Sequence, residues 1–97
     1  MELNDIREQI DKIDTQLVDL FIKRMKLCAR AGALKARSGL PIKSKPREED
    51  ILRRTAALAQ GDGLTDETRG FFISLIEISR AYQERLQKFG ANACDTD

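Results

Sequence analysis

The chain of 97 residues has the length of one domain, which we expect to span residues 1–97. A net charge of +1 and the lack of any apolar run of about 20 residues argue against nucleic-acid and membrane partners. The sequence contains no histidine, which excludes His-based triads, and Cys28 and Cys94 lack metal-ligand spacing, so no metal site is predicted. The polar opening residues do not resemble a secretory signal, and we expect a cytoplasmic protein.

The first predicted element is a long helix from about residue 4 to residue 37. Its apolar residues recur at steps of three and four, which is the helical period. Asn4 or Asp5 is the expected cap, and Ser38-Gly39-Leu40-Pro41 is expected to end the helix, because proline cannot continue it. The apolar positions are Ile6, Ile10, Ile13, Leu17, Leu20, Phe21, Leu27, Cys28, Ala31 and Leu34.

Two shorter helices are predicted to follow. The second is expected to begin near Pro46, with Ser44 or Lys45 as its cap, and to stop at the Gly-Asp-Gly stretch of residues 61–63. Thr65 is expected to cap a third helix that runs to about Phe89, followed by a disordered tail at residues 90–97. Because no strand pattern occurs in the sequence, we predict an all-α fold of three helices.

The length of the first helix predicts a second copy of the chain. A helix of this length measures about 50 Å, whereas a compact chain of this size has a diameter of only about 30–35 Å. Two shorter helices cannot cover the whole apolar face of such a rod. We therefore expect an intertwined homodimer in which the partner buries the excess.

The apolar face of the first helix also carries cations. Arg24 and Lys35 lie about 20° apart around the helix and about 16 Å apart along its axis, so both could close on one anion. Arg7 flanks the same face about 42 Å from Lys35, so it could share a small ligand with Lys35 only if it came from the other protomer. In the alternative interpretation these side chains pack their alkyl stems and keep their charges in water.

Polar residues interrupt the apolar face of the third helix too. Ser79 and Gln83 are two of them, and a buried polar group left unpaired costs about 1–3 kcal/mol. A ligand could satisfy them, or Gln83 could bond at the dimer interface. Arg47 and Glu48 add a cation and an acceptor near a helix N-terminus, which favours anions, although Glu48 could serve only the helix dipole. The interrupted run is Phe72, Ile76, Ser79, Gln83 and Leu86.

Taken in order, these features resemble the all-helical (type II) chorismate mutase family from about Leu3 to Leu86. The resemblance is carried by DIREQIDKIDTQLVDLFIKRM at residues 5–25, by the spacing from Arg24 through Lys35 to Arg47-Glu48, and by the Ser-x-x-x-Gln pattern in SRAYQ. It implies a homodimeric isomerase that converts chorismate to prephenate, on the shikimate route to phenylalanine and tyrosine. The resemblance implies no cofactor.

The resemblance also implies a role for each candidate residue. The carboxylates of chorismate would be held by Arg7 of the partner subunit, Arg24 and Arg47. The ether oxygen would accept hydrogen bonds from Lys35 and Gln83. The ring hydroxyl would donate to Glu48, and the Ser79 hydroxyl would contact the ring carboxylate. Many family members carry an acidic residue where this chain has Ser44. If the contact there is made by the backbone N–H, serine can serve; if the carboxylate matters, the affinity for the ring hydroxyl falls.

The implied chemistry suits a chain without histidine. A pericyclic rearrangement needs no nucleophile, metal or redox group, only a site that holds the substrate folded and stabilises charge on its ether oxygen. Two alternatives stay open from the sequence: an isochorismate pyruvate-lyase on the same fold, and a non-catalytic regulatory helical dimer. Incubation with chorismate and with isochorismate would distinguish the lyase from the mutase. Binding of chorismate without turnover would favour the regulatory dimer.

Overall fold

The computed structural model describes residues 2–89, which form three α-helices and one short 3-10 helix. Along the chain these are α1 (Leu3–Arg37), α2 (Lys45–Leu58), η1 (Gln60–Asp62) and α3 (Thr65–Phe89). No strand occurs within this described part, so the predicted all-α class with a very long first helix is confirmed. The tail predicted at residues 90–97 lies outside the described residues.

The first helix begins earlier than its expected cap. Glu2 is the N-cap, and its backbone N–H donates to Oδ2 of Asp5 at 3.1 Å. The prediction that Asn4 or Asp5 caps the helix was therefore wrong, because Asp5 acts from the third helical position. At the other end Gly39 adopts a φ of 70°, and the N–H of Leu40 donates to the carbonyl of Lys35 at 2.8 Å, which terminates α1 as expected.

The ends of α2 and α3 follow the same turn chemistry. Ser44, one of the two predicted caps, is the N-cap of α2. The predicted stop at Gly-Asp-Gly was wrong, since α2 already ends at Leu58 and this stretch lies in η1 and the residue that follows it. Gly63 has a φ of 69° and supplies the left-handed turn. Thr65 is the first residue of α3 rather than its cap, since the carbonyl of Leu64 already accepts from the N–H of Thr68 at 2.9 Å.

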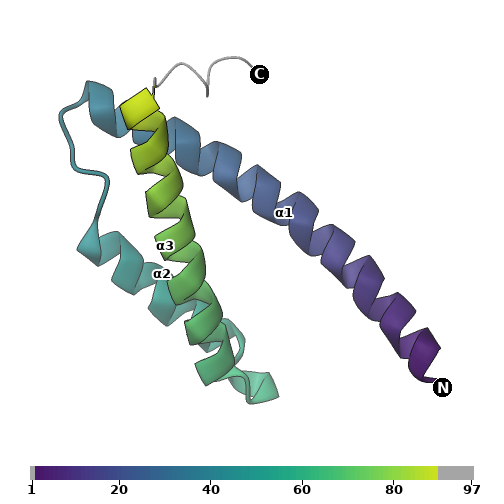
Figure 1. Ribbon diagram of the computed structural model, residues 1–97. Coiled ribbons are helices and arrows are strands. Elements are labelled where there is room, and N and C mark those ends of the chain that lie inside the picture. Colours follow the sequence, from purple (N-terminus) through teal and green to yellow (C-terminus); the bar gives the residue numbers. More distant parts are fainter. Residues whose placement is uncertain (1, 90–97) are drawn as a thin grey trace.

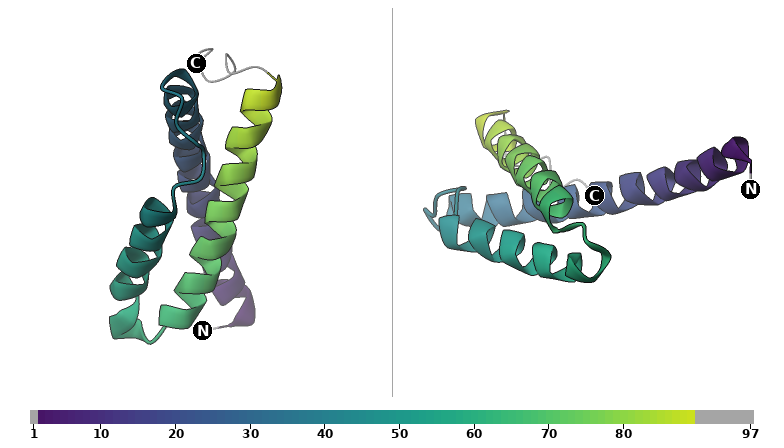
Figure 2. Two further views of the ribbon diagram at one scale, coloured as in Figure 1. Left: turned by 90° about the vertical axis from the view of Figure 1, so that its left-hand side faces the viewer. Right: turned by 90° about the horizontal axis from the view of Figure 1, so that it is seen from below.

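The three helices meet only along the C-terminal half of α1. Figure 1 shows α3 crossing α1 beside α2, while the N-terminal half of α1 continues alone, and the right-hand view of Figure 2 shows how far that half projects. The chain measures 53 × 29 × 15 Å with a radius of gyration of 16.4 Å. A compact chain of this length would have a radius near 12–13 Å. A single copy of the chain is therefore extended rather than compact.

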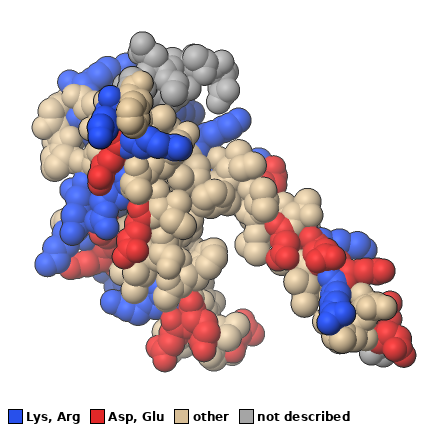
Figure 3. All heavy atoms as spheres, viewed as in Figure 1, with Lys and Arg blue, Asp and Glu red and all other residues tan. Residues whose placement is uncertain are grey.

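The buried core of the chain is small within residues 2–89. Among the described residues, the buried apolar side chains are Ala29, Ile51, Leu75 and Ile76. Every residue from position 2 to position 23 is exposed. Figure 3 shows uncharged surface running between the charged side chains of the projecting half of α1. We call the apolar residues of this half the α1 arm face; they are Leu3, Ile6, Ile10, Ile13, Leu17 and Leu20, each 42–61% exposed.

No helix within residues 2–89 combines the length and apolar character needed to cross a membrane.

Candidate active site

A cavity of about 330 Å³ opens where the three helices meet. This volume falls within the range that small-molecule sites occupy. Helix α1 contributes residues from Arg24 to Lys35, α2 contributes its first turns, and α3 contributes the stretch from Ile76 to Gln83. The lining residues are Arg24, Leu27, Cys28, Ala31, Lys35, Ile42, Ser44, Arg47, Glu48, Ile51, Ile76, Ser79 and Gln83.

The charge of this lining matches a small dianion. Its charged side chains are three cations and one carboxylate, Glu48, on otherwise apolar or neutral walls. Six of the seven residues singled out in the sequence line this one cavity, and the exception is Arg7. Arg7 lies on the projecting half of α1, exposed, about 42 Å along the helix axis from Lys35. A single chain therefore brings together every predicted site residue except the one expected from a second copy.

Arg24 is held in place by α3. Its Nη1 donates to Oγ of Ser79 at 2.7 Å and lies 3.6 Å from Sγ of Cys28. Ser79 is itself buried, and its hydroxyl donates to the carbonyl of Leu75 at 2.7 Å. Because a guanidinium carries five N–H donors, Arg24 keeps donors for a carboxylate after these contacts. Ser79 thus fixes the direction of Arg24 as well as lining the cavity.

Lys35 ties the last turn of α1 to the connection before α2. Its Nζ donates to the carbonyl of Ile42 at 2.7 Å. An ammonium group has three donors, so two remain for a ligand. Ser44 lines the cavity two residues farther on, where α2 begins. The connection therefore both orients Lys35 and forms one wall.

Gln83 fills a space that only a glycine leaves open. Its Nε2 donates to the carbonyl of Cys28 at 2.7 Å, and the residue is 7% exposed. A Cβ added at Gly32 would lie 3.2 Å from Cγ of Gln83, which is tighter than ordinary contact. Gly32 costs helix stability relative to alanine, and its contact with Gln83 gives a packing reason for its presence near the C-terminal end of α1. The second N–H of the amide remains available as a neutral donor.

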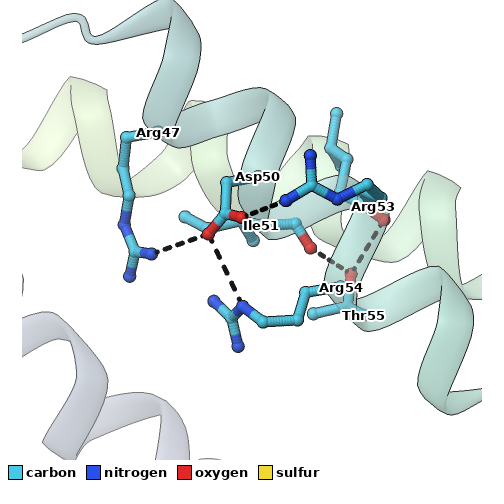
Figure 4. Close-up of polar contacts among 7 residues, drawn as sticks. Arg47, Asp50, Ile51, Arg53, Arg54 and Thr55 are labelled. Atoms are coloured by element: carbon cyan, nitrogen blue, oxygen red, sulfur yellow. Dashed lines mark hydrogen bonds and ion pairs between the residues drawn. The ribbon is translucent and has the colours of Figure 1, made fainter.

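Arg47 and Glu48 are both engaged by neighbouring charges. Nη1 of Arg47 lies 3.3 Å from Oδ2 of Asp50, and Figure 4 shows Arg53 and Arg54 reaching the same carboxylate. The Arg47 side chain is 61% exposed, so it can turn from Asp50 toward a bound anion at low cost.

Glu48 pairs across the helix interface with Arg80, whose Nη1 donates to its Oε2 at 3.1 Å. Sequence reasoning missed Arg80. The available signal was its position: Ile76, Arg80 and Gln83 follow one another at steps of four and three, so they share a face of α3.

A second cavity, of about 520 Å³, does not offer the same chemistry. It lies between α1 and α3, and its lining is Phe21, Met25, Ile78, Ala81, Tyr82 and Arg85. Arg85 contributes the one charge, and its guanidinium carbon lies 5.1 Å above the Tyr82 ring. An apolar wall with a single stacked cation does not fit a small dianion, so the first cavity is the candidate active site.

Known proteins with similar sequences point to the same family. A family model described as chorismate mutase type II matches residues 6–84. The chain is 47% identical over 62 residues to a T-protein of Enterobacter agglomerans, covering 62% of this chain and 17% of that protein. It is 37% identical over 75 residues to a T-protein of Haemophilus influenzae, covering 77% of this chain and 18% of that protein.

A bifunctional chorismate mutase/prephenate dehydratase of Aquifex aeolicus is 37% identical over 57 residues, covering 59% of this chain and 16% of that protein. The chain thus spans less than a fifth of the length of each of these relatives. The family match, by contrast, extends over most of the chain and includes every helix that lines the cavity. The chain belongs to the chorismate mutase type II family.

Proposed function

We propose that this chain is a chorismate mutase, an isomerase that rearranges chorismate to prephenate. The observation that carries the proposal is the convergence of Arg24, Lys35 and Arg47 on one cavity that also presents the Gln83 amide. Chorismate is a dicarboxylate, and arginine forks bind carboxylates with fixed direction. Family membership supports the same reaction. A cytoplasmic location and a single domain over residues 1–97 are parts of this proposal.

The proposed mechanism needs only positioning and electrostatics. Arg24 and Arg47 grip the carboxylates and hold the substrate folded, so that its reacting carbons approach each other. One C–O bond of the ether breaks as one C–C bond forms, and no proton leaves the substrate. Lys35 and Gln83 donate to the ether oxygen, where negative charge grows in the transition state, and this differential binding lowers the barrier.

The site is completed in this proposal by a second copy of the chain. Arg7 is exposed on the α1 arm, and no bend of one helix brings it to Lys35. An antiparallel partner arm would carry its Arg7 to the cavity while the two α1 arm faces bury each other. The exposed leucines and isoleucines of the arm support this arrangement, since a monomer rarely leaves so continuous an apolar surface open.

The decisive experiment follows chorismate consumption by the purified protein. Loss of chorismate with equal gain of prephenate is the expected result. The same protein is incubated with isochorismate, and release of pyruvate is measured. Pyruvate release without prephenate formation would replace the proposal with a lyase, and binding of chorismate without turnover would replace it with a regulatory dimer.

The contact between Gly32 and Gln83 gives a test on the chain itself. Gly32→Ala should lower kcat/KM about tenfold or more, because the new methyl group displaces the buried amide. Gly70→Ala is the matched control: Gly70 is also helical, its added Cβ meets nothing within 4 Å, and the substitution should raise the free energy of unfolding by about 0.5–1 kcal/mol without changing kcat/KM. Denaturant unfolding of both variants measures the free energy of unfolding, and steady-state kinetics measure kcat/KM. Full activity of the Gly32→Ala variant would contradict the assigned place of Gln83.

A further inference from the structure

The ion pair between Arg80 and Glu48 differs from the ion pairs that Lys23 and Asp50 form within residues 2–89. It joins α3 to α2, with a distance of 3.1 Å, and its side chains are only 25% and 23% exposed. Lys23–Asp19 and the contacts of Asp50 lie within single helices at spacings of three or four residues, with more exposed cations. Partial burial makes the pair between α3 and α2 less screened by water and more directional.

Only one residue of the Arg80–Glu48 ion pair lines the cavity. Glu48 lines it and Arg80 does not, so the guanidinium contacts the carboxylate from outside the ligand space. Arg80 uses Oε2 of Glu48. A carboxylate offers about four lone-pair sites, so Glu48 keeps acceptor capacity toward the cavity.

Without Arg80, the only carboxylate of the lining would face three cations alone. Arg24, Lys35 and Arg47 line the same cavity, and an unrestrained Glu48 would pair with one of them. Such a pair would remove both an acceptor and a cation from ligand binding. Arg80 offers a competing partner in a fixed direction, from a helix that is itself packed against α2.

We propose that Arg80 is a positioning residue that aims Glu48 at the ring hydroxyl of the substrate. The inference rests on the proposed function, since it takes chorismate as the ligand. Arg80 touches no substrate and acts through the Glu48 carboxylate. Its contribution therefore depends on a hydroxyl being present for Glu48 to bind, which separates it from a purely structural link between α2 and α3.

The test compares two substrates on matched variants. Arg80→Met removes the donors but keeps an apolar stem of similar length, and Arg80→Lys restores one charged donor. Arg69→Met, at an exposed position of α3, is the control for loss of an arginine. The substrates are chorismate and an analogue in which hydrogen replaces the ring hydroxyl. Circular dichroism checks each fold, and Arg80→Gln provides a second independent substitution.

With chorismate, Arg80→Met should lower kcat/KM about tenfold, mainly through KM, while Arg80→Lys recovers part of the loss. With the analogue, Arg80→Met and the unaltered chain should react equally well. In a Glu48→Gln background the Arg80→Met change should have no further effect, because the two residues act as one unit.

If Arg80→Met lowered kcat/KM equally with chorismate and with the analogue, Arg80 would only link α2 to α3, and the proposal would be overturned. An Arg80→Met enzyme that behaves like Arg69→Met would overturn it as well. An unaltered chain that fails to turn over chorismate would overturn the proposed function and this inference together, so the two failures are distinguishable.

Discussion

Lys35→Ala should lower kcat/KM by about 10²–10³, equivalent to about 2.7–4 kcal/mol of transition-state stabilisation. Lys35 is the one cationic donor assigned to the ether oxygen, and its ammonium group is oriented at the cavity wall by its bond to the Ile42 carbonyl. The ground state of the ether carries little charge, so the loss should fall on kcat as well as on kcat/KM. Steady-state kinetics on chorismate measure both.

The matched control for this variant is Lys23→Ala. Lys23 lies on the same helix, is 68% exposed and pairs only with Asp19 among the contacts that the structure gives it. The control variant should retain nearly full activity, because an exposed pair of this kind contributes little. Circular dichroism establishes that both variants fold. If the Lys35→Ala variant were as active as the Lys23→Ala variant, Lys35 would have no place in the proposed mechanism.

Mixing two inactive variants should restore activity if each site takes Arg7 from the partner subunit. Arg7→Ala and Arg24→Ala should each lose about 10²-fold or more of kcat/KM, since each removes a carboxylate fork. After subunit exchange about half of the dimers are mixed, and one of the two sites in a mixed dimer is intact. About a quarter of the activity of the unaltered protein should therefore return.

A second mixture makes this experiment specific. Arg24 and Lys35 line the same cavity of one protomer, so Arg24→Ala mixed with Lys35→Ala should recover nothing. Exchange is verified in both mixtures by co-purification of differently tagged chains. Recovery in both mixtures, or in neither, would reject a site shared in the proposed way.

Most of the fold could be predicted from the sequence because the helices are long and strongly periodic. The end of α1 followed from Gly39 and Pro41, and Ser44, one of the two expected caps of α2, is the one that the structure has. The predictions were wrong at the start of α1 and at the end of α2, where more than one neighbouring residue could cap or end the helix. Asp5 is a good cap by type, yet its carboxylate accepts from the N–H of Glu2 one turn earlier. Helix α2 stops at Leu58, and a 3-10 turn that contains Gly61 follows it.

The sequence predicted six residues that line the candidate cavity, but it did not predict the hydrogen bonds that these residues form. Helical phase placed Arg24 and Lys35 on one face, and the cavity indeed contains both. The partners of these side chains depend on how α3 crosses the other two helices and on individual rotamers, which no periodicity encodes. For this reason the bond from Arg24 to Ser79, and the pairing of Arg80 with Glu48, became visible only in the structure.

Few apolar side chains are buried within residues 2–89, and this has a thermodynamic consequence. Ala29, Ile51, Leu75 and Ile76 alone shield too little hydrocarbon to hold a 97-residue chain folded against its conformational entropy. Folding and association should then be one equilibrium governed by mass action, so the midpoint of thermal unfolding should rise with protein concentration. Melts over a wide dilution series would reveal this, and a constant midpoint would mean that the protomer is stable alone. With folding and association linked in this way, the amount of working catalyst in a cell would rise more steeply than the amount of polypeptide made.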